Sequence, residues 1–108
     1  MGIGLTALTC AVLASMTFAV VSIHSPRDEH REAVLASMQR YSATARTRPG
    51  LVFTGVVDDA GGQFVGIAVW ESEDAARAAA PALMAEVGDD PFSEWDVRPI
   101  EGFRGQVL

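Results

Sequence analysis

LVFTGVVDDAGGQFVGIAVWESEDA, residues 51–75, is the stretch of sequence that decides the fold. Its two runs of β-branched and aromatic residues, Leu51–Val57 and Gln63–Trp70, are typical of strands. Between them, residues 58–62 supply the aspartates and glycines that tight turns favour. The stretch therefore predicts a β-hairpin that leads directly into a helix.

The helix after the hairpin has both a start and a stop signal. Ser72 can cap its amino end, and the alanine-rich sequence behind it continues to about Val87 and stops at Gly88. We expect Pro81 to kink or split this helix. Residues 98–108 then predict a closing strand, whose proline and glycines suit the edge of a sheet.

The sequence before the hairpin predicts one strand and one helix. Residues 17–24 are β-branched and aromatic, as in a buried strand. Ser25 can cap the next helix, with Pro26 at its first position. This amphipathic helix covers about residues 27–46, and Pro49-Gly50 ends it. Its apolar stripe consists of Val34, Leu35, Met38, Tyr41 and Ala45.

The predicted elements follow the order β-α-β-β-α-β, which defines a ferredoxin-like α+β fold. In this fold two helices cover one face of a four-stranded antiparallel sheet and leave the other face bare. Both alternating sets of strand side chains are largely apolar here, so both faces require burial. Leaving them in water would cost several kcal/mol per subunit, at about 25 cal/mol per Å². We therefore expect a homodimer in which a second copy covers the bare face.

Composition and charge exclude several classes of protein. The chain has 108 residues, enough for one domain, and its net charge of −6 opposes binding to nucleic acid. Its one cysteine, Cys10, can form neither an intrachain disulfide nor a cysteine-based metal site. The two histidines, His24 and His30, lack a metal-ligand spacing, and the absence of lysine removes Schiff-base chemistry. We expect no metal and no cofactor.

The first 23 residues are uncharged and mostly apolar, which raises the question of a membrane segment. No positive charge precedes Arg27, so a secretory signal is poorly supported. A membrane helix and the predicted strand cannot both use residues 17–23. We expect residues 1–15 to be an apolar extension and residues 16–108 to form the folded domain. We expect the protein to be cytoplasmic. The alternative is association with a membrane through residues 1–23.

One family resemblance rests on the same part of the chain. Pro49-Gly50-Leu51, Asp58-Asp59 and the run from Phe64 to Ala75 resemble the antibiotic biosynthesis monooxygenases, which are dimeric α+β barrels. The resemblance extends over residues 17–108. It implies a cofactor-independent oxygenase that holds a small aromatic or quinol-like compound between sheet and helices.

The chain departs from the family pattern at two points. Family members often carry a histidine about nine residues after the tryptophan, where this chain has Ala79. The related haem-degrading enzymes use an asparagine, and this chain contains none. A non-catalytic ligand-binding or structural dimer of the same fold is therefore the alternative function.

Five residues are candidates for the site. His24 ends the first strand, where a neutral imidazole can act as a base, and Trp70 matches the family tryptophan. We predict these two as catalytic and Tyr41, Met38 and Phe64 as substrate-binding. His24, Trp70 and Tyr41 also have a structural alternative, because a histidine at a loop or an aromatic side chain in the core needs no ligand. Arg98 and Arg104 could anchor an anion or form salt bridges between subunits.

Overall fold

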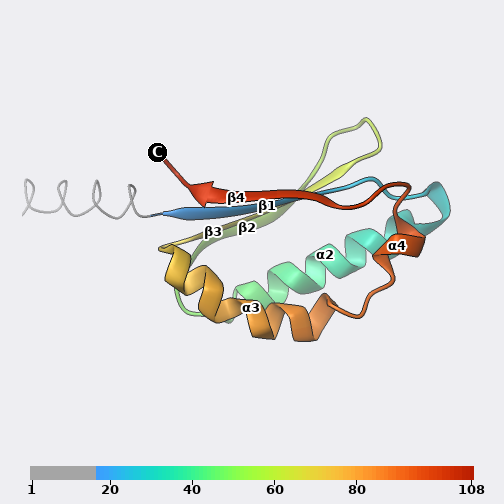
Figure 1. Ribbon diagram of the computed structural model, residues 1–108. Helices are drawn as coiled ribbons and strands as arrows, with labels where there is room; N and C mark the ends of the chain where they lie inside the picture. The colour runs from blue at the N-terminus through green and yellow to red at the C-terminus, as the bar shows by residue number, and fades with distance from the viewer. Residues whose placement is uncertain (1–16) are drawn as a thin grey trace, which may run out of the picture.

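A four-stranded antiparallel sheet forms one layer of the protein, and the helices form the other (Figure 1). The computed structural model describes residues 17–108. Their order of elements confirms the predicted ferredoxin-like fold. The elements are β1 (Phe18–His24), the 3₁₀ helix η1 (Asp28–His30), α2 (Arg31–Ala45), β2 (Leu51–Asp58), β3 (Phe64–Trp70), α3 (Glu73–Val87), α4 (Phe92–Trp95) and β4 (Glu101–Gln106). The predicted extension over residues 1–15 lies outside the described residues.

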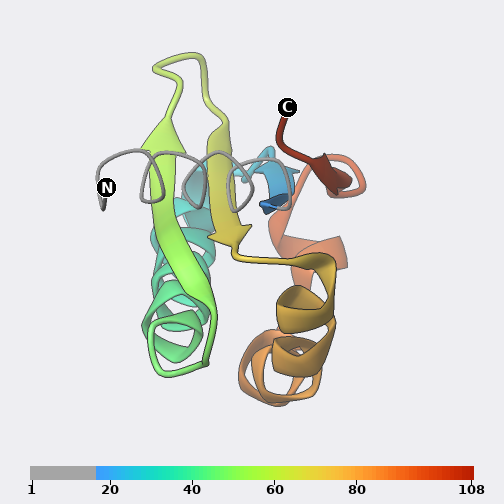
Figure 2. The ribbon, with the colours of Figure 1, turned by 90° about the vertical axis from the view of Figure 1, so that its left-hand side faces the viewer.

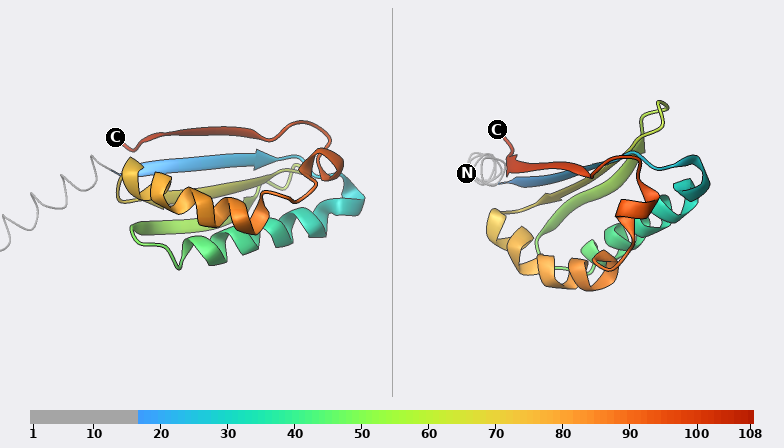
Figure 3. Two further views of the ribbon diagram at one scale, coloured as in Figure 1. Left: turned by 60° about the horizontal axis from the view of Figure 1, so that its bottom comes forward. Right: turned by 45° about the vertical axis from the view of Figure 1, so that its right-hand side comes forward.

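The strand order is β2-β3-β1-β4, so β1 lies inside the sheet and β4 at the predicted edge position. β1 pairs with β3 from Phe18↔Trp70 to His24↔Phe64. Because side chains alternate along a strand, the even-numbered residues of β1 face the helices and the odd-numbered ones face away. The helices α2 and α3 lie side by side on one face of the sheet (Figure 3).

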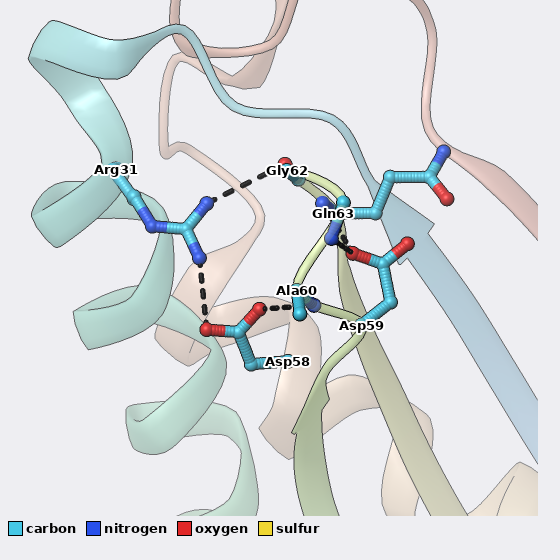
Figure 4. A network of polar contacts seen from close by, with 7 residues as sticks. Arg31, Asp58, Asp59, Ala60, Gly62 and Gln63 are labelled. Atoms are coloured by element: carbon cyan, nitrogen blue, oxygen red, sulfur yellow. Dashed lines mark hydrogen bonds and ion pairs between the residues drawn. The ribbon is translucent and has the colours of Figure 1, made fainter.

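The turn between β2 and β3 extends beyond the rest of the sheet (Figure 2) and is held by two aspartates. Asp58 accepts hydrogen bonds from the Ala60 N–H and from Nη2 of Arg31, each at 2.9 Å (Figure 4). Oδ1 of Asp59 accepts from the Gln63 N–H, also at 2.9 Å. Arg31 belongs to α2, so this network fastens the hairpin to the helical layer.

The first helical segment begins differently from the prediction. Pro26 forms a β-bridge with Asp96, so the chain is still extended where a helix was expected. Oγ of Ser25 accepts from Nε2 of Gln63 at 3.2 Å, and its carbonyl oxygen accepts from the Val97 N–H at 2.8 Å. The predicted cap at Ser25 is therefore wrong, because contacts with distant segments hold this serine outside the helix.

The second long helix, α3, follows the prediction more closely. The Ala75 N–H donates to Oγ of Ser72 at 3.1 Å, which confirms the predicted cap. The helix ends at Val87, and Gly88 follows as its C-cap. Pro81 lies inside α3, which continues past it as a single helix, so the helix is not split there.

Buried side chains form two groups at opposite ends of the sheet. The larger group lies at the end where Phe18 pairs with Trp70 and comprises Phe18, Ala45, Ala68, Trp70, Ala76, Ala79 and Leu83. The smaller group lies at the other end and comprises Val34, Met38 and Phe64. Ala68 of the larger group and Met38 of the smaller group both line the cavity that forms the candidate site.

The face of the sheet that points away from the helices is uncovered (Figure 1). Large apolar side chains lie on it: Phe53 is 55% exposed, Val57 49% and Phe103 64%. Phe103 pairs with Val21, an outward-facing residue of β1. Both faces of the sheet are therefore apolar, as predicted, while the dimer that would cover the bare face stays a prediction.

Candidate functional site

A cavity of about 250 Å³ lies between the sheet and the helices. Its wall comes from β1, α2, β2, β3, α3, Phe92 of α4 and Ile100. Much of this wall is apolar, including Val20, Met38, Val56, Met84, Val87 and Phe92. Six polar side chains interrupt it: Ser22, His24, Ser37, Tyr41, Ser42 and Thr54. A concave apolar space with a few polar groups is the usual form of a small-molecule site.

The sheet is open at the cavity because β3 carries a glycine at position 66. A Cβ atom on Gly66 would lie 2.8 Å from Oγ of Ser22 and 3.1 Å from Cε of Met38. Any larger residue would therefore crowd two side chains of the cavity wall. A glycine inside a strand often marks such a close approach.

His24 is paired with a buried carboxylate. Nδ1 of His24 lies 3.1 Å from Oδ2 of Asp96, and the two residues are only 5% and 3% exposed. A carboxylate only accepts hydrogen bonds, so we assign the Nδ1 proton to this contact. The imidazole ring also lies against Phe92, with 5.1 Å between ring centroids. His24 is thus an enclosed side chain of the cavity wall and does not lie at an open loop.

The short helix α4, which was not predicted, brings Asp96 to His24. The segment after β1 holds α4 by backbone contacts, because the Arg27 N–H donates to the Trp95 carbonyl oxygen at 2.8 Å. Nε of Arg27 donates to the Glu94 carbonyl oxygen at 3.1 Å. The chain that follows His24 therefore positions its partner, 72 residues further along the sequence.

Three of the cavity hydroxyl groups already have partners in the protein. Oγ of Ser42 and Oγ1 of Thr54 are 3.1 Å apart and join α2 to β2. Oγ of Ser37 donates to Oδ2 of Asp90 at 2.5 Å, and Arg40 donates to the same oxygen at 2.8 Å. These groups hold the wall together.

Three other polar groups of the wall have no hydrogen-bond partner among residues 17–108. They are Nε2 of His24, Oγ of Ser22 and Oη of Tyr41. Ser22 and His24 are two residues apart on one face of β1, and Tyr41 approaches from α2. A bound molecule can therefore satisfy all three from inside the cavity.

Tyr41 carries its proton more firmly than an exposed tyrosine does. Burial raises the pKa of its phenol above the ordinary value of 10.0, and the positive charge of Arg104 opposes this rise only in part. At neutral pH the Tyr41 hydroxyl can both donate and accept a hydrogen bond. Arg104 also lies 5.3 Å from the centroid of the Phe18 ring, on the helical side of β4.

The structure brings three of the five predicted site residues together. His24, Tyr41 and Met38 line the cavity. Trp70 is fully buried in the larger core group, and Phe64 is buried in the smaller one beneath the Arg31 guanidinium, 4.2 Å from its ring centroid. Neither residue lines the cavity, so the placement favours the structural alternative for Trp70 and a core-packing role for Phe64.

The sequence interpretation missed Asp96, Ser22 and Gly66. Alternation along the first strand could have found Ser22, because it shares the face of His24. Gly66 could have been found as a glycine inside a strand. No local signal identifies Asp96, since its role depends on the fold of a four-residue helix.

Arg98 and the acidic side chains at the start of α3 do not line the cavity. Arg98 lines a separate hollow beside Asp96. Glu73 and Asp74 face Arg77, at 3.0 and 3.5 Å, which accounts for this acidic pair without a ligand. Within residues 17–108, no cluster of three or more metal-ligating side chains is present. No helix of this part of the chain has the length and apolar character needed to cross a bilayer.

Comparison with known proteins identifies the fold. No family model and no curated protein matches the sequence. Among solved structures, a conserved protein from Methanosarcina mazei matches with a TM-score of 0.79 and 12% identity, over 91% of this chain and 99% of its own. A mutant of SnoaB, a cofactor-independent oxygenase from Streptomyces nogalater, matches with a TM-score of 0.67 and 20% identity, over 83% and 91%.

A third similar structure comes from Nitrosomonas europaea and is provisionally named an antibiotic biosynthesis monooxygenase. Its TM-score is 0.70 at 15% identity, over 87% of this chain and 92% of its own. The chain thus has the fold of antibiotic biosynthesis monooxygenase-like proteins, as the resemblance in its sequence predicted. At these identities the likeness concerns the fold alone.

Proposed function

We propose that this protein is a cofactor-independent monooxygenase of small aromatic or quinol-like compounds. The observation that carries the proposal is an apolar cavity in which Nε2 of His24, Oγ of Ser22 and Oη of Tyr41 have no partner among residues 17–108. The fold of the SnoaB oxygenase, shared at 20% identity, supports the reaction class.

The size of the cavity is consistent with an aromatic substrate. An apolar cavity of roughly 150 Å³ can hold one benzene molecule. The 250 Å³ available here therefore suit a compound of more than one ring. Met38, Met84 and Phe92 offer polarisable surfaces to such rings.

The reaction begins with removal of a proton from the substrate. Nε2 of His24 accepts the proton, and the resulting anion donates its electrons to molecular oxygen. For an anthrone, one oxygen atom enters as the new carbonyl group and the other leaves as water, so the substrate supplies every electron. Ser22 and Tyr41 hydrogen-bond the substrate oxygen and stabilise its negative charge.

We also propose that the protein works as a homodimer joined through the bare face of the sheet. Phe53, Val57 and Phe103 are about half exposed or more on that face, and a second copy would remove them from water.

The second candidate is a dimer that binds a ligand without transforming it. The position of Trp70 favours this alternative, because the residue that matches the family tryptophan lies in the core and not on the cavity wall. Ala79, at the position where family members often carry a histidine, is likewise buried in the core.

Oxygen consumption by metal-free protein distinguishes the two candidates. We expect uptake with at least one member of a panel of anthrones, quinols and flavonols. The variant His24→Ala should lower the rate about 100-fold or more, whereas His30→Ala, which changes the other histidine, should not. Ligand binding without uptake would favour the non-catalytic dimer, and uptake unchanged in His24→Ala would reject the proposed base.

A further inference from the structure

The Asp96 side chain lies behind the imidazole of His24 as seen from the cavity. His24 belongs to the cavity wall, whereas Asp96 does not and lines a different hollow. The carboxylate therefore cannot touch a molecule in the cavity. It can act there only through His24, with which it shares the 3.1 Å contact.

Nε2 of His24 is the ring nitrogen that remains available. Asp96 Oδ1 is the one fully enclosed side-chain polar atom without a partner among residues 17–108. Nε2 of His24 has no hydrogen-bond partner in this part of the chain either. Because it is not fully enclosed as Asp96 Oδ1 is, some of its surface must be accessible. The cavity beside His24 provides this surface.

The Asp96 side chain has no other bonding role among the described residues. Its backbone forms the bridge to Pro26, and its N–H donates to the Phe92 carbonyl oxygen at 2.8 Å, so these contacts survive a change of side chain. Oδ2 meets His24 alone, and Oδ1 is enclosed without any donor. Folded proteins rarely keep an unpartnered enclosed carboxylate oxygen, so this one calls for an explanation, and a catalytic role is one of those known.

We propose that Asp96 is a positioning residue that keeps the proton of His24 on Nδ1 and presents Nε2 to the cavity. The His24–Asp96 pair then exchanges protons with a bound substrate whether or not oxygen is present. Nε2 takes a proton from an acidic C–H group, which leaves imidazolium and a resonance-stabilised carbanion. The imidazolium returns a proton, and no electron leaves the substrate. The inference rests on the proposed function, because it uses the same cavity and base, but it does not require the oxygen step.

The tautomer of His24 provides a spectroscopic test. The chain contains only two histidines, so ¹⁵N imidazole spectra of the labelled full chain can be assigned with His30→Ala. We expect neutral His24 to carry its proton on Nδ1. Asp96→Ala should shift the tautomer of His24 toward the Nε2–H form that a free imidazole side chain favours in water. Glu94→Gln, which removes an exposed charge from α4, should leave the tautomer unchanged. An unchanged tautomer in Asp96→Ala would overturn the inference.

Hydrogen exchange without oxygen provides the catalytic test. The full chain is mixed with an anthrone in D₂O under argon, and loss of the acidic C–H signal is followed by NMR. We expect exchange faster than in buffer, abolished in His24→Ala and lowered roughly 10- to 100-fold in Asp96→Ala, with KM nearly unchanged. Glu94→Gln should exchange at the wild-type rate.

The outcomes separate this inference from the proposed function. Exchange under argon without oxygen uptake in air supports the His24–Asp96 pair and rejects the monooxygenase. Uptake in air without exchange above buffer under argon rejects the pair's role. If circular dichroism shows that Asp96→Ala does not fold, the isosteric variant Asp96→Asn replaces it. The positioning role is overturned if that variant loses the Nδ1–H form of His24 but still exchanges at the wild-type rate.

Discussion

Gly66 of β3 and Met38 of α2 are neighbours in the cavity wall, so close that a Cβ atom on Gly66 would lie 3.1 Å from Cε of Met38. The same Cβ atom would lie 2.8 Å from Oγ of Ser22. Real Cβ atoms essentially never lie as close to another atom as 2.8 Å, so the Ser22 side chain or the backbone at position 66 would have to move. The glycine therefore keeps the polar group Ser22 accessible to a ligand.

The variant Gly66→Ala should narrow the cavity and weaken ligand binding. Forcing an extra carbon into a packed site costs roughly 1–3 kcal/mol, and we expect the unfolding midpoint in urea to fall accordingly. Calorimetric titration with an anthrone under argon measures the loss of affinity.

Gly105→Ala is the matched control for this change. It introduces the same methyl group into β4, where nothing lies within 4 Å of the new atom. Its affinity and stability should remain near those of the wild type. Equal binding by both variants would contradict the proposed location of the ligand.

Tyr41 should ionise above the pH range of an ordinary tyrosine. Burial raises its pKa, so the folded protein holds this proton longer than the unfolded chain does. Tyr41 thus contributes stability that is fully present below pH 10 and is lost as the pH rises through the folded-state pKa. The chain has a single tyrosine, so phenolate absorbance at 295 nm reports Tyr41 alone.

The titration compares native protein with protein in concentrated urea. We expect the pH midpoint of Tyr41 ionisation to be higher in the native protein than in urea. Above pH 10, the free energy of unfolding should fall less in Tyr41→Phe than in the wild type. Arg104→Gln should raise the native midpoint further, because it removes the opposing positive charge. Coincident native and unfolded midpoints would show that the phenol is not shielded from water.

The sequence could predict those parts of the fold that depend on local signals. The hairpin follows from its strand residues and its aspartate-glycine turn, and α3 follows from the Ser72 cap. The cap predicted at Ser25 was wrong because the bridge between Pro26 and Asp96 outweighs the local preference for a helix start. Tertiary contacts decide such positions, and one sequence does not reveal them.

The candidate site divides in the same way. Strand alternation and the helical stripe place His24, Met38 and Tyr41 on surfaces that face each other, so their meeting in one cavity could be predicted. The contact between His24 and Asp96 spans 72 residues and depends on α4, a helix too short to have a periodic signal. Trp70 matches a motif, but its depth in the core becomes visible only in the folded chain.

The hairpin turn should make the protein sensitive to acid. The hydrogen bond from the Ala60 N–H, which is the largest single cause, and the hydrogen bond and positive charge of Arg31 together hold the pKa of Asp58 below its ordinary value. Asp58 therefore contributes stability that is present above its ordinary, unfolded-state pKa of 3.8 and is lost as the pH falls through the lower folded-state pKa. In urea unfolding series from pH 7 to pH 3, Asp58→Ala should lose less stability than the wild type.

Arg31→Gln separates the two causes of this effect. It removes the ion pair at 2.9 Å but leaves the bond from the Ala60 N–H, which is the largest single cause. We expect this variant to retain part of the acid sensitivity. If Arg31→Gln lost as much acid sensitivity as Asp58→Ala does, the effect would belong to the ion pair instead.

The last prediction concerns the bare face of the sheet, and it uses variants that place a charge there. Phe53→Glu and Phe103→Glu should each convert the dimer to a folded monomer, because burial of such a ring contributes roughly 1.5–3 kcal/mol and a buried carboxylate would oppose association. Ala85→Glu adds the same charge to an exposed position of α3 and should remain dimeric. Light scattering at micromolar concentration measures the mass of each variant. A wild-type protein that is folded and monomeric under these conditions would remove the case for the dimer, whereas dissociation caused by Ala85→Glu alone would move the interface to the helical side.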